Sequence, residues 1–379
     1  MNALPTLRSC LALTFLFCGA TFSWAAFKPG EIWPDDKGVH INAHGGGVLY
    51  DDGAYYWFGE HKTEGSGGNV AHVGVHVYAS KNLYDWQDKG IALAVSKDPA
   101  SDITDGCILE RPKVLRCPKT GKYVMFFHLE LKDKGYDMAR TGIAVADAIT
   151  GPYRFLRSVR PNAKHWPLNV KPEQITPEAI AAAKRGLPIS NGPSEKGKSV
   201  DVFVANYDEG QMSRDMTLFQ DDDGRAYHIF ASEHNSTVQI AELTDDYLDY
   251  TGRYARALEK TWTEGLAVCK RQGVYYMIGS GCTGWAPNTA RAFKATNIFG
   301  PWTPLGNPCL GVNPQNKLGP EKTWGGQSTF ILCVKPDTYI AMFDIWHPDN
   351  AIDGRYIWLP ITFTEGGIAV TWQDAWSLK

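Results

Sequence analysis

Residues 261–284 read TWTEGLAVCKRQGVYYMIGSGCTG, and they contain a pattern that recurs along the chain. Glu264 precedes a short apolar run, a polar turn at 270–273 ends in glycine, and a run rich in β-branched and aromatic residues follows at 274–278. Two apolar runs joined by a short turn that contains glycine are typical of a β-hairpin. The sequence therefore predicts a hairpin with Glu264 at the start of its first strand.

Four further segments repeat this design, at residues 44–60, 110–127, 214–230 and 327–343. In each segment a polar residue precedes the first strand, and an aromatic-rich second strand follows the turn. The chain between the hairpins contains third strands, such as residues 142–146, and then a polar turn with an apolar or aromatic plug. Repeated four-stranded units indicate a propeller, so we predict an all-β fold, a five-bladed β-propeller that occupies residues 27–379.

The polar residues that begin the five hairpins should face one another. In a propeller the innermost strand of every blade lies beside the central axis, so residues at the same end of these strands share one funnel. The alternative is that each polar residue only caps a turn, but turn caps need not recur at one register. We therefore expect a functional site at the five hairpin heads, which are His44, Glu110, Asp215, Glu264 and Gln327.

Composition excludes few functions. The formal net charge is −3, which gives no argument for a nucleic acid or an acidic polymer as a partner. The 13 tryptophans and 17 tyrosines are numerous, and they serve either as core residues or as surfaces on which sugar rings stack. We expect no cofactor and no metal, because His44 and Asp215 lack a third ligand, and we expect a monomer.

The first 25 residues have the features of a secretory signal. Arg8 is followed by an apolar segment at 10–22 and by a small-x-small cleavage site at 23–25. The apolar segment is too short for a comfortable membrane span, and no second candidate span follows. We therefore expect an exported protein, periplasmic or extracellular.

Six cysteines follow the predicted signal segment. An even number of cysteines in an oxidising compartment permits disulfides, but buried free thiols fit equally well. One further region breaks the repeat: residues 160–210 read as an insertion on a face of the propeller, with one short helix at 177–184. This insertion either shapes a cleft or decorates the rim.

The chain resembles glycoside hydrolase family 43, in the branch of exo-β-1,3-galactanases. The resemblance covers nearly all of the chain after the leader, in order, and it is carried by the motifs NAHGGGVL (42–49), WFGEH (57–61), ERPKV (110–114), SRDMTLF (213–219), DDDGRAYHIFASEHN (221–235), GCTGWAPN (281–288), GPWTPLGNPC (300–309) and GGQSTF (325–330). The family fold is a five-bladed propeller, which agrees with the repeat.

The resemblance implies an inverting glycosidase, in which an acid protonates the leaving oxygen and a base assists water on the opposite face. By this resemblance Glu264 is the acid, and Glu110 is the neighbouring carboxylate that raises the pKa of the acid. Most of the family has an aspartate at the head of the first blade, where this chain has residues 42–44, NAH. The resemblance therefore assigns the orientation of the water to Gln327 on the fifth blade, although a structural role for Gln327 stays open.

Other residues in these motifs are expected to bind a sugar. Glu60 and Asp215 can accept hydrogen bonds from hydroxyl groups, and aromatic faces can stack on the ring. His44 holds a water on the axis or caps the glycine run. The remaining candidates are Tyr136, Trp285, Thr283, Asn235, Arg214 and Trp57.

Three functions follow from these observations. The first is an exo-enzyme that releases galactose from β-1,3-galactan, with a plant-type polysaccharide or oligosaccharide as its substrate. The second keeps the fold and changes the substrate, as in an α-L-arabinofuranosidase or a β-xylosidase. The third is a non-catalytic sugar-binding propeller, which the missing first-blade carboxylate would permit. The presence of both Glu110 and Glu264 favours an enzyme.

Overall fold

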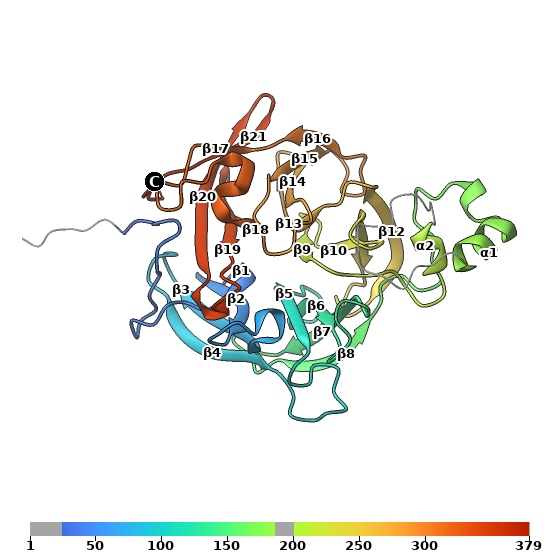
Figure 1. Ribbon diagram of the computed structural model, residues 1–379, viewed down its shortest axis with the longest axis horizontal. Helices are drawn as coiled ribbons and strands as arrows, with labels where there is room; N and C mark the ends of the chain where they lie inside the picture. Colours follow the sequence, from blue (N-terminus) through green and yellow to red (C-terminus); the bar gives the residue numbers. More distant parts are fainter. Residues whose placement is uncertain (1–24, 186–200, 379) are drawn as a thin grey trace, which may run out of the picture.

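The computed structural model describes residues 25–185 and 201–378, and its regular structure is mostly β-strand. Five antiparallel sheets form a ring around a central axis (Figure 1). The predicted five-bladed β-propeller is therefore confirmed. The predicted leader lies outside the described residues, except for Ala25. None of the helices in the described part of the chain combines the length and the apolar character that a membrane span requires.

The first three sheets follow the chain in order, with four strands each. The first contains β1 (His44–Asp51), β2 (Ala54–Lys62), β3 (His72–Ser80) and β4 (Gln87–Ala94). The second contains β5 (Ile108–Arg116), β6 (Tyr123–Glu130), β7 (Arg140–Ala146) and β8 (Arg154–Val159). The third contains β9 (Met216–Gln220), β10 (Ala226–Ser232), β11 (Thr237–Leu243) and β12 (Tyr250–Leu258).

The last two sheets complete the ring. The fourth contains β13 (Glu264–Arg271), β14 (Val274–Ser280), β15 (Arg291–Ala295) and β16 (Thr303–Gly306). The fifth contains β18 (Gln327–Lys335), β19 (Thr338–Ile345), β20 (Arg355–Thr364) and β21 (Gly367–Thr371), and the short β17 (Cys309–Leu310) pairs in parallel with β21. In the described part of the chain the connections contain the 3₁₀ helices η1 (Gly68–Val70), η2 (Pro172–Gln174), η3 (Pro320–Gly325) and η4 (Ala351–Asp353).

Apolar side chains pack between neighbouring blades. Strand β6 shows how one strand serves two interfaces: Met125 and Phe127 pack toward the first blade, whereas Val124 and Phe126 pack toward the third. Successive residues of a strand point to opposite faces, and a sheet covered on both faces needs apolar residues at nearly every position. Five such clusters, one for each neighbouring pair of blades, hold the ring together.

The heads of three innermost strands share one backbone device. The pairing of β1, β5 and β13 with their neighbours is interrupted by a register shift directly after His44, Glu110 and Glu264. The next residue in each case has a positive φ, 62° at Gly45, 56° at Arg111 and 62° at Gly265. Bulges of this kind re-aim a side chain at the end of a strand. A bulge thus directly follows three of the five polar heads.

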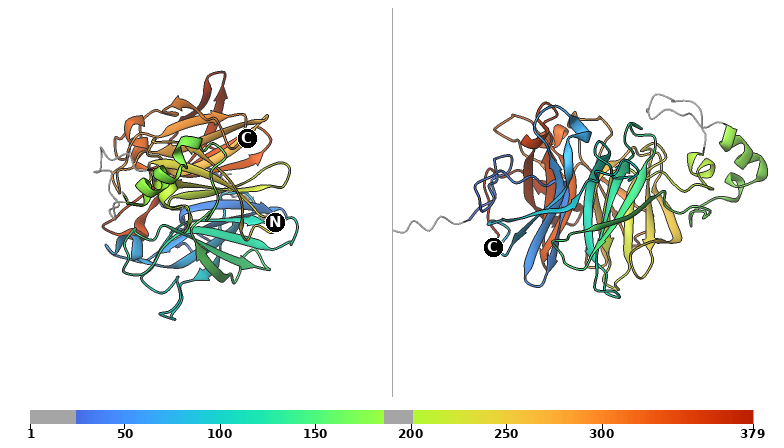
Figure 2. Two further views of the ribbon diagram at one scale, coloured as in Figure 1. Left: turned by 90° about the vertical axis from the view of Figure 1, so that its right-hand side faces the viewer. Right: turned by 90° about the horizontal axis from the view of Figure 1, so that it is seen from below.

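The described part of the insertion lies outside the ring, beside β12 (Figures 1 and 2). It carries α1 (Pro177–Arg185), which confirms the predicted helix, and α2 (Val202–Ala205). The backbone N–H of Leu168 donates to the carbonyl of Tyr254 over 2.7 Å and so joins the insertion to β12. Residues 186–200 of the insertion lie outside the described residues, and both expectations for this region stay predictions.

Candidate active site

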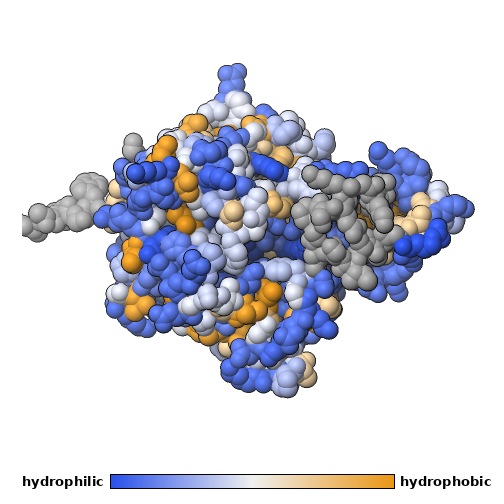
Figure 3. Space-filling view, viewed as in Figure 1, coloured by the Kyte–Doolittle hydropathy of each residue, from blue (hydrophilic) through white to orange (hydrophobic). Residues whose placement is uncertain are grey.

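A cavity of about 400 Å³ lies where the heads of the innermost strands meet. Figure 3 shows this face of the molecule, on which hydrophilic residues surround a central hollow. Nine of the twelve expected site residues line the cavity, together with four that were not expected. The nine are Glu60, Glu110, Tyr136, Arg214, Asp215, Asn235, Glu264, Trp285 and Gln327; the additional four are Asn69, Arg111, Gly284 and Trp346.

Glu264 is in an environment that keeps its carboxyl group protonated. Burial is the largest influence on its pKa, the negative charge of Asp215 is the next, and together they raise the pKa to about 8. Asn235 donates a hydrogen bond from Nδ2 to Oε1 of Glu264 over 2.6 Å, which fixes the orientation of the carboxyl group. At neutral pH Glu264 therefore carries a proton that it can donate.

Asp215 is the charge that acts on Glu264. Its Oδ2 accepts a hydrogen bond from the backbone N–H of Gly265 over 2.9 Å and lies 3.0 Å from Nη2 of Arg111. Because Asp215 is held against the backbone of Gly265, the residue after Glu264, its negative charge disfavours the ionised form of Glu264. The expected source of this effect was Glu110, so the assignment is corrected to Asp215.

Glu110 has the opposite environment. Burial alone would raise its pKa, but Nδ1 of His128 lies 2.9 Å from one carboxylate oxygen and the hydroxyl of Tyr136 donates to the other over 2.8 Å. These partners lower the pKa of Glu110 to about 2, and hydrogen bonds to Glu110 and Glu130 overcome burial to raise the pKa of His128 to about 9. Glu110 is therefore a fixed anion.

Gln327 is held by three partners. Its Oε1 accepts hydrogen bonds from Nη2 of Arg111 over 2.5 Å and from Nε1 of Trp346 over 3.3 Å. Its Nε2 donates to Oγ of Ser280 over 2.9 Å. One Nε2 hydrogen remains for a ligand, because a primary amide has two. The side chain is therefore preorganised, which supports the expectation that it orients a water or a hydroxyl group.

Arg111 links these groups and was not expected as a site residue. Besides Gln327 and Asp215, it contacts the carbonyl of Ser328 through Nη1 over 3.1 Å, and its backbone N–H donates to Glu60 over 2.9 Å. Its position directly after a hairpin head could have identified it. A non-glycine residue with positive φ, such as Arg111 at 56°, persists only where its surroundings enforce it.

Glu60 was expected to accept hydrogen bonds from sugar hydroxyls. One of its oxygens accepts the Arg111 N–H, and the other lies 2.6 Å from Nζ of Lys62. The side chain is buried, and burial raises its pKa despite the pairing with Lys62. Both oxygens thus have partners within the chain, Glu60 lines the cavity, and its role as an acceptor for sugar hydroxyls remains a prediction.

Three expected site residues do not reach the cavity. Trp57 is 1% exposed and packs edge-on against Trp86 and Tyr356 in the core, so its role as a sugar platform is corrected to a core residue. His44 is fully buried, and burial lowers its pKa well below the ordinary value, so a neutral ring lies beneath the funnel. Thr283 lines a neighbouring cavity instead.

The six cysteines of the described chain are free thiols. Of the two interpretations left open by the sequence, the structure thus shows free cysteines. Glu110, His128 and Asp215 each bring one possible metal-ligating atom within 4.8 Å of the others. Both ring nitrogens of His128 already face carboxylates, Nδ1 at 2.9 Å from Glu110 and Nε2 at 3.0 Å from Glu130.

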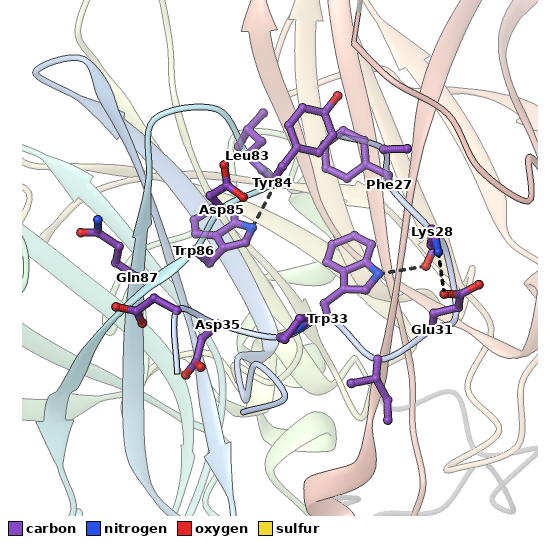
Figure 4. Close-up of a pocket in the computed structure, with 14 residues that line it drawn as sticks. Phe27, Lys28, Glu31, Trp33, Asp35, Leu83, Tyr84, Asp85, Trp86 and Gln87 are labelled. Carbon is purple, nitrogen blue, oxygen red and sulfur yellow. Dashed lines mark hydrogen bonds and ion pairs between the residues drawn. The ribbon is translucent and has the colours of Figure 1, made fainter. Parts of the chain in front are cut away.

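A larger cavity, of about 500 Å³, lies far from these carboxyl groups, between the N-terminal segment and the β3–β4 connection (Figure 4). Its indole N–H groups are already used: Nε1 of Trp33 donates to the carbonyl of Lys28 over 2.9 Å, and Nε1 of Trp86 donates to Leu83 over 3.0 Å. Trp33 and Trp86 are 9% and 2% exposed. The indole N–H groups of these two tryptophans are therefore not available to a ligand.

A family model described as glycosyl hydrolases family 43 matches residues 191–343. A solved family 43 β-1,3-galactosidase with galactodeoxynojirimycin is 45% identical, with a TM-score of 0.81, and the match covers 93% of this chain and 100% of that chain. An exo-β-1,3-galactanase from Phanerochaete chrysosporium, solved with β-1,3-galactotriose, is 28% identical, with a TM-score of 0.73 and coverage of 93% and 68%.

Among curated proteins, a β-D-galactofuranosidase from Aspergillus niger is 34% identical over 80 residues, which are 21% of this chain and 23% of that protein. The match thus spans about a quarter of the curated relative. A propeller with a protonated carboxyl group beside an ionised one defines a glycosidase-type site. With the 45% identity over complete domains, the chain belongs to glycoside hydrolase family 43.

Proposed function

We propose that the protein is an inverting exo-glycosidase that releases galactose from β-1,3-galactan. The observation that carries the proposal is the contrast between a protonated Glu264 and an ionised Glu110 in one cavity. The solved β-1,3-galactosidase that is 45% identical supports the choice of sugar and linkage.

In the proposed reaction Glu264 donates its proton to the oxygen that links galactose to the rest of the chain. As this bond breaks, the hydroxyl of a water adds to the anomeric carbon from the opposite face. The proton released by the water replaces the one that Glu264 gave, through solvent, so each turnover consumes one water. Asn235 holds the donor carboxyl in place, and Asp215 keeps it protonated until the substrate arrives.

Gln327 orients the water in this proposal. Arg111 and Trp346 hold its carbonyl oxygen, and Ser280 holds one amide hydrogen, so the other amide hydrogen has a fixed direction. A preorganised dipole of this kind costs no reorganisation when the reaction occurs. Glu110, an anion held by His128 and Tyr136, accepts hydrogen bonds from sugar hydroxyls.

Attack at a chain end is supported by similarity alone. The solved protein from Phanerochaete chrysosporium that is 28% identical is an exo-β-1,3-galactanase.

The test is a substrate comparison with the purified protein. We expect release of galactose from β-1,3-galactobiose and β-1,3-galactan, and little hydrolysis of aryl arabinofuranoside, aryl xyloside or aryl β-galactofuranoside. Proton NMR of the first turnovers should show the α-anomer of galactose before mutarotation. Early β-galactose would contradict inversion, preference for a furanoside or xyloside would change the substrate, and binding without hydrolysis would indicate a sugar-binding protein.

We also propose that the protein is exported and acts as a monomer. The basic, apolar and small-residue segments of the leader support export. Cell fractionation with a leader deletion as the control tests export, and size-exclusion chromatography with light scattering tests the monomer. A mature protein retained in the cytoplasm, or a stable dimer, would contradict the respective proposal.

A further inference from the structure

The turn between β10 and β11, residues 233–236, has a strained backbone. Three consecutive residues that are not glycine have a positive φ, 52° at Glu233, 56° at His234 and 65° at Asn235. The left-handed conformation is unfavourable for residues other than glycine, although asparagine adopts it more readily than most. Such strain persists only where the surroundings enforce it, and it is concentrated at functional sites. The contacts that hold this turn are therefore informative.

The turn carries the residue that orients the proposed proton donor. Nδ2 of Asn235 donates to Oε1 of Glu264 over 2.6 Å. The side chain of asparagine is short, so the backbone of the turn sets the direction of this hydrogen bond. The turn also meets the segment before Glu264, because the backbone N–H of Trp262 donates to the carbonyl of Ser236 over 3.2 Å. The groups that hold the turn thus also hold the carboxyl group of Glu264.

Glu233, the first residue of the turn, is fixed by four hydrogen bonds. Its side chain is buried, and Arg256 donates to both carboxylate oxygens, from Nε over 2.7 Å and from Nη2 over 2.8 Å. Gln239 donates to one oxygen and Thr237 to the other, each over 3.1 Å. A two-pronged contact between arginine and a carboxylate fixes the geometry of both groups. The turn therefore cannot relax without breaking a buried ion pair.

Arg256 is itself held by the insertion. It lies on β12, the outermost strand of the third blade, and neither it nor Glu233 lines the cavity that contains Glu264. Its guanidinium lies 4.1 Å from the centre of the Phe203 ring on α2. Its backbone N–H donates to Oδ1 of Asn169 over 3.1 Å, and its carbonyl accepts from Nδ2 of Asn169 over 3.0 Å. Phe203 and Asn169 both belong to the insertion, so the insertion sets the position of the guanidinium.

We propose that Arg256 is a positioning residue for Glu264 and that the insertion keeps Arg256 in place. Arg256 fixes Glu233, Glu233 fixes the turn, and the turn directs Asn235 to the carboxyl group of Glu264. This inference rests on the proposed function, because it assumes that Glu264 donates a proton. It gives the insertion a part in the reaction, although none of its described residues lines the cavity.

The test is Arg256→Lys, which keeps the positive charge but cannot form the two-pronged contact with Glu233. Two substrates are used: β-1,3-galactobiose, whose leaving sugar needs a proton, and β-galactosyl fluoride, whose leaving group needs little protonation. On galactobiose we expect kcat to fall about tenfold or more with KM little changed, because a shift of about 1 Å in a catalytic group costs up to about a hundredfold. The loss on the fluoride should be much smaller. Arg253→Lys, on the same strand with a side chain that is 57% exposed, is the matched control and should leave both rates unchanged.

A double variant tests the link through Asn235. Asn235→Gly removes the donor to Glu264 and suits the left-handed backbone. This substitution alone should lower kcat on galactobiose, and the addition of Arg256→Lys should lower it no further, because both changes act through one contact. A further loss of the same size would show that Arg256 acts by another route, such as the bond between Ser236 and Trp262, and would overturn the inference.

Other results would also overturn it. Equal losses of kcat on both substrates would show that Arg256 supports the cavity as a whole, and unchanged kcat on both would show that the turn does not need the two-pronged contact. Thermal unfolding shows whether each variant is folded at the assay temperature. If Arg256→Lys does not fold, then Phe203→Leu, which keeps Arg256 and removes the ring beside it, should show the same difference between the two substrates. A wild-type protein that cleaves neither substrate would instead contradict the proposed function.

Discussion

The heads of the second and fourth blades have the same position in the fold and opposite ionisation. Glu110 and Glu264 each lie at a bulge near the start of an innermost strand, and each is followed by a residue with positive φ. Burial would raise both pKa values. In the second blade His128 reverses this effect, and the pKa is about 2; in the fourth blade Asp215 adds to it, and the pKa is about 8.

The comparison shows that the backbone places a carboxyl group and that the neighbouring side chains decide its chemistry. Proton donor and permanent anion arise from one repeated hairpin, because the adjacent strand carries an imidazole in one blade and the adjacent head carries a carboxylate in the other. Each of the following variants changes one side of this contrast.

The largest effect is expected for Glu264→Gln, which removes the proton donor and keeps the shape. Activity on β-1,3-galactan should fall about 10²–10⁴-fold, the contribution typical of general acid catalysis. The loss should be much smaller on a galactoside with a good leaving group, because that oxygen needs little protonation. Glu31→Gln, at an exposed surface position, is the control. Equal losses on both substrates would contradict the role of Glu264.

The next largest effect is a loss of stability, expected for His128→Gln in the second blade. His128→Gln leaves Glu110 and Glu130 buried without their cation, which should cost about 3–5 kcal/mol in the free energy of unfolding at pH 6. Urea unfolding measures this change, with the exposed His165→Gln as the control.

The sign of the pH dependence follows from the two pKa values. The raised pKa of His128 stabilises the fold fully below about pH 6.5, and this contribution is lost as pH rises through about 9. The lowered pKa of Glu110 stabilises the fold fully above about pH 4.3, and this contribution is lost as pH falls through about 2. The difference between wild type and His128→Gln should therefore shrink from pH 6.5 to 9; a constant difference would mean that His128 is neutral.

A smaller effect is expected for Asp215→Asn, which removes the like charge beside Glu264. In the pH profile of kcat/KM, the basic limb should move from near pH 8 to lower pH, by about one to two pH units, because Glu264 loses its proton more easily. Asp245→Asn, whose carboxylate is exposed, should leave the limb in place. If Glu110→Gln moves the limb and Asp215→Asn does not, then Glu110 is the perturbing charge after all.

The smallest effect is expected for Gly265→Ala. A Cβ at this position would lie 2.9 Å from both Cγ of Gln327 and the carbonyl oxygen of Ser328, and the φ of 62° is unfavourable for alanine. The substitution should cost about 1–2 kcal/mol in stability and displace Gln327. Gly273→Ala is a matched control, because Gly273 also has a positive φ, 80°, but has no neighbour within 4 Å. We expect kcat to fall for Gly265→Ala and not for Gly273→Ala. Identical kcat values for the two variants would show that Gln327 does not act in the reaction.

The repeat in the sequence was sufficient to predict the fold and four hairpin heads that line the cavity, whereas the other expected lining residues came from the motifs of the family resemblance. Alternating apolar strands, glycine turns and polar heads are local signals, and they are read directly from residues such as Glu264 and Gln327. Trp57 was misplaced because a motif does not report which face of a strand points to the core. Trp346 was missed because it follows the second strand of its hairpin, where no polar head recurs.

The exchange of roles between Asp215 and Glu110 required three-dimensional structure. His128 lies on β6, and its pairing with Glu110 depends on the register between β5 and β6. Asp215 reaches Gly265 across the boundary between two blades. Neither contact follows from spacing along the chain.

The contact between the two ends of the chain, at the join of the first and fifth blades, makes the propeller suitable for circular permutation. Phe27 and Trp376 exchange backbone hydrogen bonds, so the two ends of the propeller lie together, and within residues 25–185 and 201–378 no sheet combines strands from the first and the fifth blade. A short linker between these ends would make the ring continuous, and the chain could then be opened at the exposed turn residues 222–223. The order in which a gene encodes the five blades is thus separable from the ring that they form.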